Sequence, residues 1–162
     1  NNRSHRNARI FVSFLFVSGL LNTMDHSDAI VSTTTTSNML IKMTQELLDS
    51  ISNQNFIRYQ ELCHPTLTAF EPEACGHLIH GLKFHKHYFD MKTNPATKPQ
   101  VNVTIVNPHV RLCGPDVGIV SYVRVIQRDF KTVRTEETRV WQRVEGKWAH
   151  VHFHRSQPNN SY

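Results

Sequence analysis

The sequence of 162 residues contains few cysteines and no closely spaced cysteine pair. Its three cysteines, Cys63, Cys75 and Cys113, lie far apart, and their number is odd. This pattern argues against a zinc ribbon and against a disulfide framework, because both need paired cysteines. It favours a reducing compartment, and we expect a cytoplasmic protein.

Phosphate-binding and phosphate-transfer motifs are also missing. Neither G-x-x-x-x-G-K-[ST] nor G-x-G-x-x-G occurs, and there is no kinase catalytic loop and no D-F-G. A chain of 18.8 kDa has room for one ordinary globular domain but not for a kinase domain. We therefore expect a non-catalytic chain that needs no cofactor.

A long hydrophobic segment is likewise absent, because the one extended apolar run, residues 10–21, is shorter than the roughly 20 residues that span a bilayer. We expect no stable membrane insertion. Arg3, Arg6 and Arg9 precede this run, so it has the outline of a secretory signal or of a basic amphipathic calmodulin target. An extension without fixed structure is the favoured interpretation. Together with the Thr-rich segment 32–38, it predicts an extension and linker over residues 1–38.

Charge of one sign is not concentrated anywhere. The 18 Lys and Arg residues exceed the 13 Asp and Glu residues, which gives a net charge of +5, but the cations are scattered. Arg139 and Arg143 alternate with Trp141, and Glu136 and Glu137 lie directly beside them. A solvated strand face explains this pattern better than a nucleic-acid site, so we expect no nucleic-acid partner.

The folded part of the chain changes from helical to extended patterns along its length. Apolar residues at helical spacing predict a long amphipathic helix over 39–52, followed by helices over 56–63 and in the second half of 76–89. Val-, Ile- and Thr-rich runs predict strands at 66–70, 101–106, 109–112, 117–130, 132–144 and 148–155. Helices followed by an antiparallel meander indicate an α+β fold with the long helix packed in a curved sheet. The domain is expected over 39–157, with a tail at 158–162.

Three histidines alternate near the end of the chain. His150, His152 and His154 are predicted to share one strand face with Trp148, which suggests a zinc site. Zinc needs three or four converging ligands, and no carboxylate lies nearby in the sequence. A packed or half-exposed surface is therefore favoured, and we predict no metal.

Arginines occur inside strands that otherwise suit burial. Arg124, Arg139 and Arg155 are each flanked by apolar or aromatic residues. A buried guanidinium must be paired, either with a carboxylate of the protein or with one of a ligand. From spacing alone, an internal ion pair or an outward-facing side chain is favoured.

Several segments resemble, in colinear order, the association (hub) domain of calcium/calmodulin-dependent protein kinase II, and they span about residues 40–156. The resemblance implies the cone-shaped fold of nuclear transport factor two and the ketosteroid isomerases. It also implies self-assembly into two stacked rings, as dodecamers or tetradecamers, that organise the kinase subunits. The segments are F-E-P-E-A at 70–74, F-H at 84–85, Y-F at 88–89, N-P-H at 107–109, E-E-T-R-V-W at 136–141, G-K-W at 146–148 and V-H-F-H-R-S at 151–156.

Hubs of this family carry a pocket for small carboxylates related to gamma-hydroxybutyrate. The resemblance implies that its members here are Tyr59, His85, Arg124, Arg139 and Arg155. Converging arginines would hold a carboxylate by charge-assisted hydrogen bonds.

The sequence departs from the family pattern at three places. The loop 90–95 lacks the tryptophan that gates the pocket in vertebrate hubs, the hairpin 128–135 is shorter than usual, and His150 replaces an aliphatic residue. No kinase domain precedes the hub, so the chain is either a fragment or a freestanding hub.

Two other function classes stay open. Isomerase and cyclase relatives of the cone fold use an Asp or Glu as general base, but no such carboxylate stands out among the strand residues here. A secreted small-molecule-binding protein would agree with the N-terminal run and with the sequon at 102–104. That sequon lies in a predicted strand, where a glycan is awkward.

Overall fold

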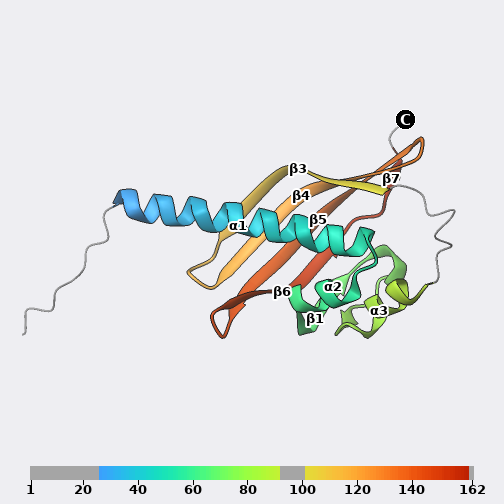
Figure 1. Ribbon diagram of the computed structural model, residues 1–162, viewed down its shortest axis with the longest axis horizontal. Coiled ribbons are helices and arrows are strands. Elements are labelled where there is room, and N and C mark those ends of the chain that lie inside the picture. Colours follow the sequence, from blue (N-terminus) through green and yellow to red (C-terminus); the bar gives the residue numbers. More distant parts are fainter. Residues whose placement is uncertain (1–25, 92–100, 161–162) are drawn as a thin grey trace, which may run out of the picture.

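The computed structural model describes residues 26–91 and 101–160 (Figure 1). Three α-helices and a 3-10 turn accompany seven strands in this part of the chain. The helices are α1 (His26–Ser52), α2 (Phe56–Leu62) and α3 (Lys83–Asp90), and the turn is η1 (Pro72–Ala74). The strands are β1 (Cys63–Phe70), β2 (Ile79–His80), β3 (Val101–Leu112), β4 (Val117–Arg128), β5 (Lys131–Val144), β6 (Lys147–Arg155) and β7 (Asn159–Asn160).

The strands form one sheet in the order β2-β1-β6-β5-β4-β3, and β7 pairs with β5. Neighbours from β6 to β3 are antiparallel, whereas β1 runs parallel to β6. Helix α1 lies across one face of the curved sheet, and α2 and α3 gather at one end of it (Figure 1). The predicted α+β architecture, with a long helix packed in a curved and mainly antiparallel sheet, is confirmed.

Helix α1 begins much earlier than the sequence predicts. Residues 26–38, expected as an irregular linker, are helical and project beyond the sheet (Figure 1). The Thr33 and Thr35 hydroxyls donate to the carbonyls of Ala29 and Val31, four residues back, so these side chains turn onto the helix backbone. The apolar run 10–21 lies outside the described residues.

Strand β3 is continuous where two strands were expected. Its pairing with β4 shifts register between Val106 and His109, and Asn107 there has a φ of 49°. An Asn tolerates this left-handed conformation, and the Pro that follows cannot donate to a ladder. Asn107-Pro108 is therefore a β-bulge inside one strand, not a turn between two.

The core lies between α1 and the inner face of the sheet. Leu40, Leu47 and Leu48 of α1 are fully buried, and Trp141 of β5 is their largest partner. The Trp141 indole donates a 3.1 Å hydrogen bond to the Thr44 hydroxyl, which itself donates to the carbonyl one turn back. This pairing satisfies the polar atoms that α1 and β5 bury against each other.

A glycine sets how closely α1 approaches β4. A Cβ built on Gly118 would lie 2.3 Å from the Leu40 Cδ1 atom, which is closer than any real contact. Because Leu40 is fully buried, its side chain has little room to move away.

We expect Gly118→Ala to lower the free energy of unfolding by about 1–3 kcal/mol through overpacking. Urea denaturation at fixed protein concentration measures this loss. Leu40→Ala alone should cost about 2–5 kcal/mol, but it removes the clashing atoms, so the double variant should be more stable than the two single losses predict. Strict additivity would contradict this packing.

Candidate functional site

A cavity of about 340 Å³ lies where the C-terminal end of α1 meets α2, α3 and the inner face of the sheet. Tyr59 comes from α2, His85 from α3, Arg124 from β4, Arg139 from β5 and Arg155 from β6. The five residues that the family resemblance assigns to one pocket therefore do line one cavity, although they belong to five different elements. The remaining lining residues are Ile51, Glu71, Glu73, Tyr88, Phe89, Ile126, Arg128 and Phe153.

The deepest charged group of the cavity is the buried pair of Arg139 and Glu137. An Arg139 terminal nitrogen lies 2.7 Å from Glu137 Oε2, and its Nε donates to the Tyr122 hydroxyl at 2.7 Å. The Tyr122 hydroxyl in turn donates to the same Glu137 oxygen at 2.6 Å. These three side chains form a closed hydrogen-bonded network, which is how a buried charge pair avoids a net cost.

Glu137 corrects two expectations from the sequence. It was assigned to a solvated strand face, and no carboxylate was singled out among the strand residues, but it is 2% exposed. Alternation along β5 turns Thr135, Glu137, Arg139 and Trp141 inward and leaves Glu136 outside. Arginine at the second position after a glutamate in a strand is the signal that could have revealed this pair.

The electrostatics of the pair keep Glu137 ionised. Burial raises the pKa of Glu137, but the positive charges of Arg139 and Arg124 outweigh it and lower the pKa to about 2. Burial alone would lower the pKa of Arg139, and Tyr122 and Glu137 reverse that direction. A carboxylate with so low a pKa is a poor general base at neutral pH, which disfavours isomerase-type proton transfer by this residue.

Arg124 is less well paired than Arg139. Its closest ion-pair contact to Glu137 is 3.3 Å, and burial lowers its pKa. Its Nε is buried and has no hydrogen-bond partner within the described part of the chain. Arg124 therefore presents an unused donor at the cavity wall, which suits an anionic ligand.

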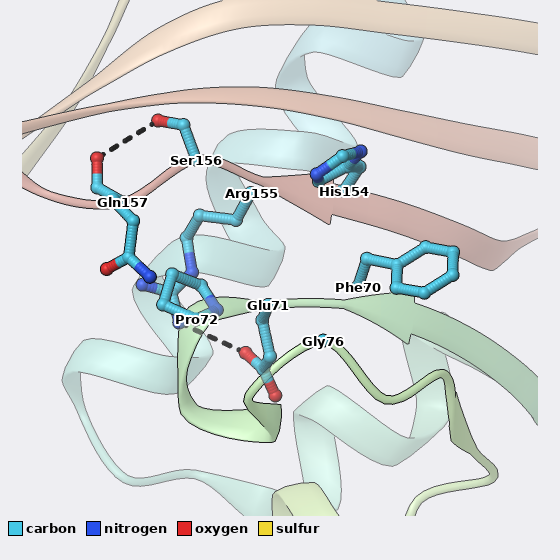
Figure 2. A pocket seen from close by; sticks show the side chains of 8 residues that line it. All are labelled: Phe70, Glu71, Pro72, Gly76, His154, Arg155, Ser156 and Gln157. Atoms are coloured by element: carbon cyan, nitrogen blue, oxygen red, sulfur yellow. Dashed lines mark hydrogen bonds and ion pairs between the residues drawn. The ribbon is translucent and has the colours of Figure 1, made fainter.

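Arg155 is held by two acidic residues at the edge of the cavity. It donates to Glu71 at 3.1 Å and also contacts Glu73. Figure 2 shows this pair from the outside, where Glu71 and Arg155 also line a second, shallower groove with Phe70 and His154. The Glu71–Arg155 pair is thus part of the wall between the cavity and the outer surface.

His85 lies on the inner side of this wall. Its Nε2 is 3.3 Å from Glu71 Oε1, yet neither ring nitrogen makes an aligned hydrogen bond with a described residue. Burial raises the pKa of Glu71, but His85 and Arg155 outweigh it and lower the pKa. Glu71 and Glu73 escaped the sequence analysis, where they were only part of the F-E-P-E-A segment.

The three alternating histidines do not share a face. Pairing between β5 and β6 shifts register, so that Trp141 opposes His150 and Val140 opposes His152. This β-bulge turns His150 into the core, whereas His154 is exposed on the other face. The expected shared histidine surface is therefore wrong. No group of three or more potential metal ligands occurs among residues 26–91 and 101–160.

His150 is a neutral histidine in the centre of the protein. It is fully buried, accepts from Arg139 at 3.3 Å through Nε2, and directs Nδ1 to the Cys63 sulfur at 3.6 Å. Burial and the positive charge of Arg139 lower its pKa well below 6.5. Cys63 is inert for a related reason, because burial raises its pKa to about 12.

Two further observations limit the chemistry of the chain. Within the described ranges no helix is long and apolar enough to cross a membrane. Most of the loop 90–95, where the resemblance places a gate, lies outside those ranges, so its effect on the cavity stays a prediction.

Comparison with known proteins identifies the family. Residues 36–159 match the family "Calcium/calmodulin dependent protein kinase II association domain". The delta subunit of calcium/calmodulin-dependent protein kinase type II from Oryctolagus cuniculus is 46% identical over 122 residues, which cover 72% of this chain and 23% of that protein. The chain thus spans about a quarter of its curated relative.

Solved structures agree with this assignment. The hub homology domain from Chlamydomonas reinhardtii is 45% identical with a TM-score of 0.71, and the match covers 75% of this chain and 96% of that chain. An NTF2-like protein from Cytophaga hutchinsonii, 19% identical with a TM-score of 0.56 over 74% of this chain and 95% of its own, shows the fold alone.

The buried neutral His150 predicts acid sensitivity. The unfolded chain protonates this ring near pH 6.5 while the folded chain does not, so the unfolded state gains protons and stability falls as the pH drops below about 6.5. We expect His150→Leu to reduce this pH dependence by up to about 1.4 kcal/mol per pH unit. Urea denaturation at pH 7.5 and 5.5 measures it, with the exposed His154→Gln as control. Equal pH dependence in the wild type and His150→Leu would refute the prediction.

Proposed function

Because this chain belongs to the family of calcium/calmodulin-dependent protein kinase II association domains, we propose that it is a non-catalytic oligomerisation domain that assembles into a stacked ring. The match of residues 36–159 to the association domain, and not to a kinase domain, carries this proposal. Dodecamers and tetradecamers are the expected sizes. In the cytoplasm such a ring would gather kinase subunits of the same family and raise their effective concentration for one another.

Exposed apolar side chains on the single chain support self-association. Ile57 on α2 is 74% exposed, and Phe130 at the tip of the β4–β5 hairpin is fully exposed. Large apolar groups at such prominent positions are costly in water and are commonly covered between subunits. The short hairpin that ends in Phe130 thus bears on the number of subunits in the ring.

We further propose that the cavity binds a small carboxylate through Arg124, Arg139 and Arg155, with Tyr59 and His85 as polar contacts. The unused Nε donor of Arg124 is the observation that favours this proposal, because a buried guanidinium without partners gains most from an added anion. Arg139 differs in its role, since Glu137 already neutralises it.

Native mass spectrometry of residues 38–162 tests the assembly. We expect a discrete species of a dozen or more subunits, because the family match covers the whole association domain. A monomer or dimer at micromolar concentration would contradict the proposal. That result would favour the alternative, a freestanding small-molecule-binding protein with the isomerase-like fold.

Arg124→Gln tests the pocket. It should weaken binding of 4-hydroxybutyrate, measured by calorimetry, at least tenfold because it removes the unused donor and one positive charge. Arg111→Gln is the matched control, since Arg111 is exposed on β3 and does not line the cavity. Arg139→Gln is unsuitable, because it would leave the buried Glu137 carboxylate unpaired and unfold the site. Unchanged affinity in Arg124→Gln would sink the assignment.

A further inference from the structure

The charges around the cavity balance almost completely within the protein. Four guanidinium groups line it, from Arg124, Arg128, Arg139 and Arg155. Glu71 and Glu73 also line it, and Glu137 lies behind Arg124 and Arg139 in contact with both. Four positive and three negative groups leave a single positive charge at the described wall of the cavity.

The uncompensated charge has a definite position. Arg139 forms its short contact with Glu137, and Arg155 contacts both Glu71 and Glu73. Arg124 has only the 3.3 Å contact with Glu137, whose carboxylate is already bound by Arg139, and its Nε is unused within the described chain. The surplus positive charge is therefore centred on Arg124.

We propose that this cavity selects ligands with one negative charge and rejects those with two, and that Glu137 and Glu73 are the residues that set this selectivity. The inference rests on the proposed carboxylate pocket and extends it to the class of ligand. One carboxylate bound at Arg124 neutralises the site. A second carboxylate in the same cavity must approach Glu71 and Glu73, where no free guanidinium compensates it and the low dielectric strengthens repulsion.

Each of the two glutamates can be neutralised without changing side-chain size. Glu73 is the safer position, because 41% of its side chain is exposed and the protein does not depend on it for burial. Glu73→Gln removes one of the two carboxylates on Arg155 and frees that guanidinium for a second ligand carboxylate. Glu137→Gln acts at the floor of the cavity, where it frees Arg124 and Arg139 together.

Two four-carbon acids test the proposal, because 4-hydroxybutyrate carries one negative charge at pH 7.5 and succinate carries two. Calorimetry on the full 162-residue chain gives the ratio of their two affinities. We expect the wild type to bind 4-hydroxybutyrate at least tenfold more tightly than succinate. Glu73→Gln should narrow that ratio at least threefold, and Glu137→Gln at least tenfold.

Glu136→Gln is the matched control. It changes the neighbouring residue by the same chemistry, but Glu136 is exposed on the opposite face and hydrogen bonded to Ser156. Its ratio should equal that of the wild type. Because the readout is a ratio, a general loss of folded protein does not imitate the effect, and Glu73→Gln decides the matter if Glu137→Gln does not fold.

The outcomes separate this inference from the function on which it rests. If neither acid binds the wild type, the carboxylate pocket itself is wrong and the inference falls with it. If both acids bind the wild type equally, or if Glu73→Gln and Glu137→Gln keep the wild-type ratio, the pocket stands and charge selectivity by these glutamates is overturned.

Discussion

The buried ion pair between Glu137 and Arg139 is the interaction on which the fold and the cavity both depend. A guanidinium in the core of a small domain is tolerated only when a carboxylate neutralises it and every polar atom finds a partner. Tyr122 closes the network on one side, and His150 accepts from Arg139 on the other. The Arg139 guanidinium also lies 4.5 Å from the centre of the Phe153 ring, so it is packed as well as paired.

This network joins the cavity to the rest of the core. His150 contacts Cys63 at the start of β1, and its neighbour Trp141 is hydrogen bonded to Thr44 of α1. The cavity wall is thus continuous with the helix–sheet interface, and no loop is needed to position Arg139. A rigid, preorganised wall suits a binding site, because little side-chain entropy is lost when a ligand arrives. It also explains why a non-catalytic association domain retains a polar interior.

The sequence predicted the fold class, the order of the elements and five cavity residues, the last through family resemblance. Periodicity found the amphipathic part of α1 because its apolar face is buried, but it missed 26–38, where threonines bond to the helix backbone and no packing pattern exists. The face of His150 was wrong because a β-bulge reverses the alternation from which faces are inferred. Glu137 was missed because a charged residue in a strand pattern is assigned to solvent until its partner is known in space.

The central claim is that Glu137 and Arg139 stabilise the protein as a pair. The most direct measurement is a double-mutant cycle of Glu137→Gln, Arg139→Gln and the double variant, with unfolding followed in urea at one protomer concentration. Each single variant leaves one buried charge alone and should cost about 3–5 kcal/mol, whereas the double variant should cost much less than the sum. Additive losses would show that the two side chains act independently, and would contradict the account.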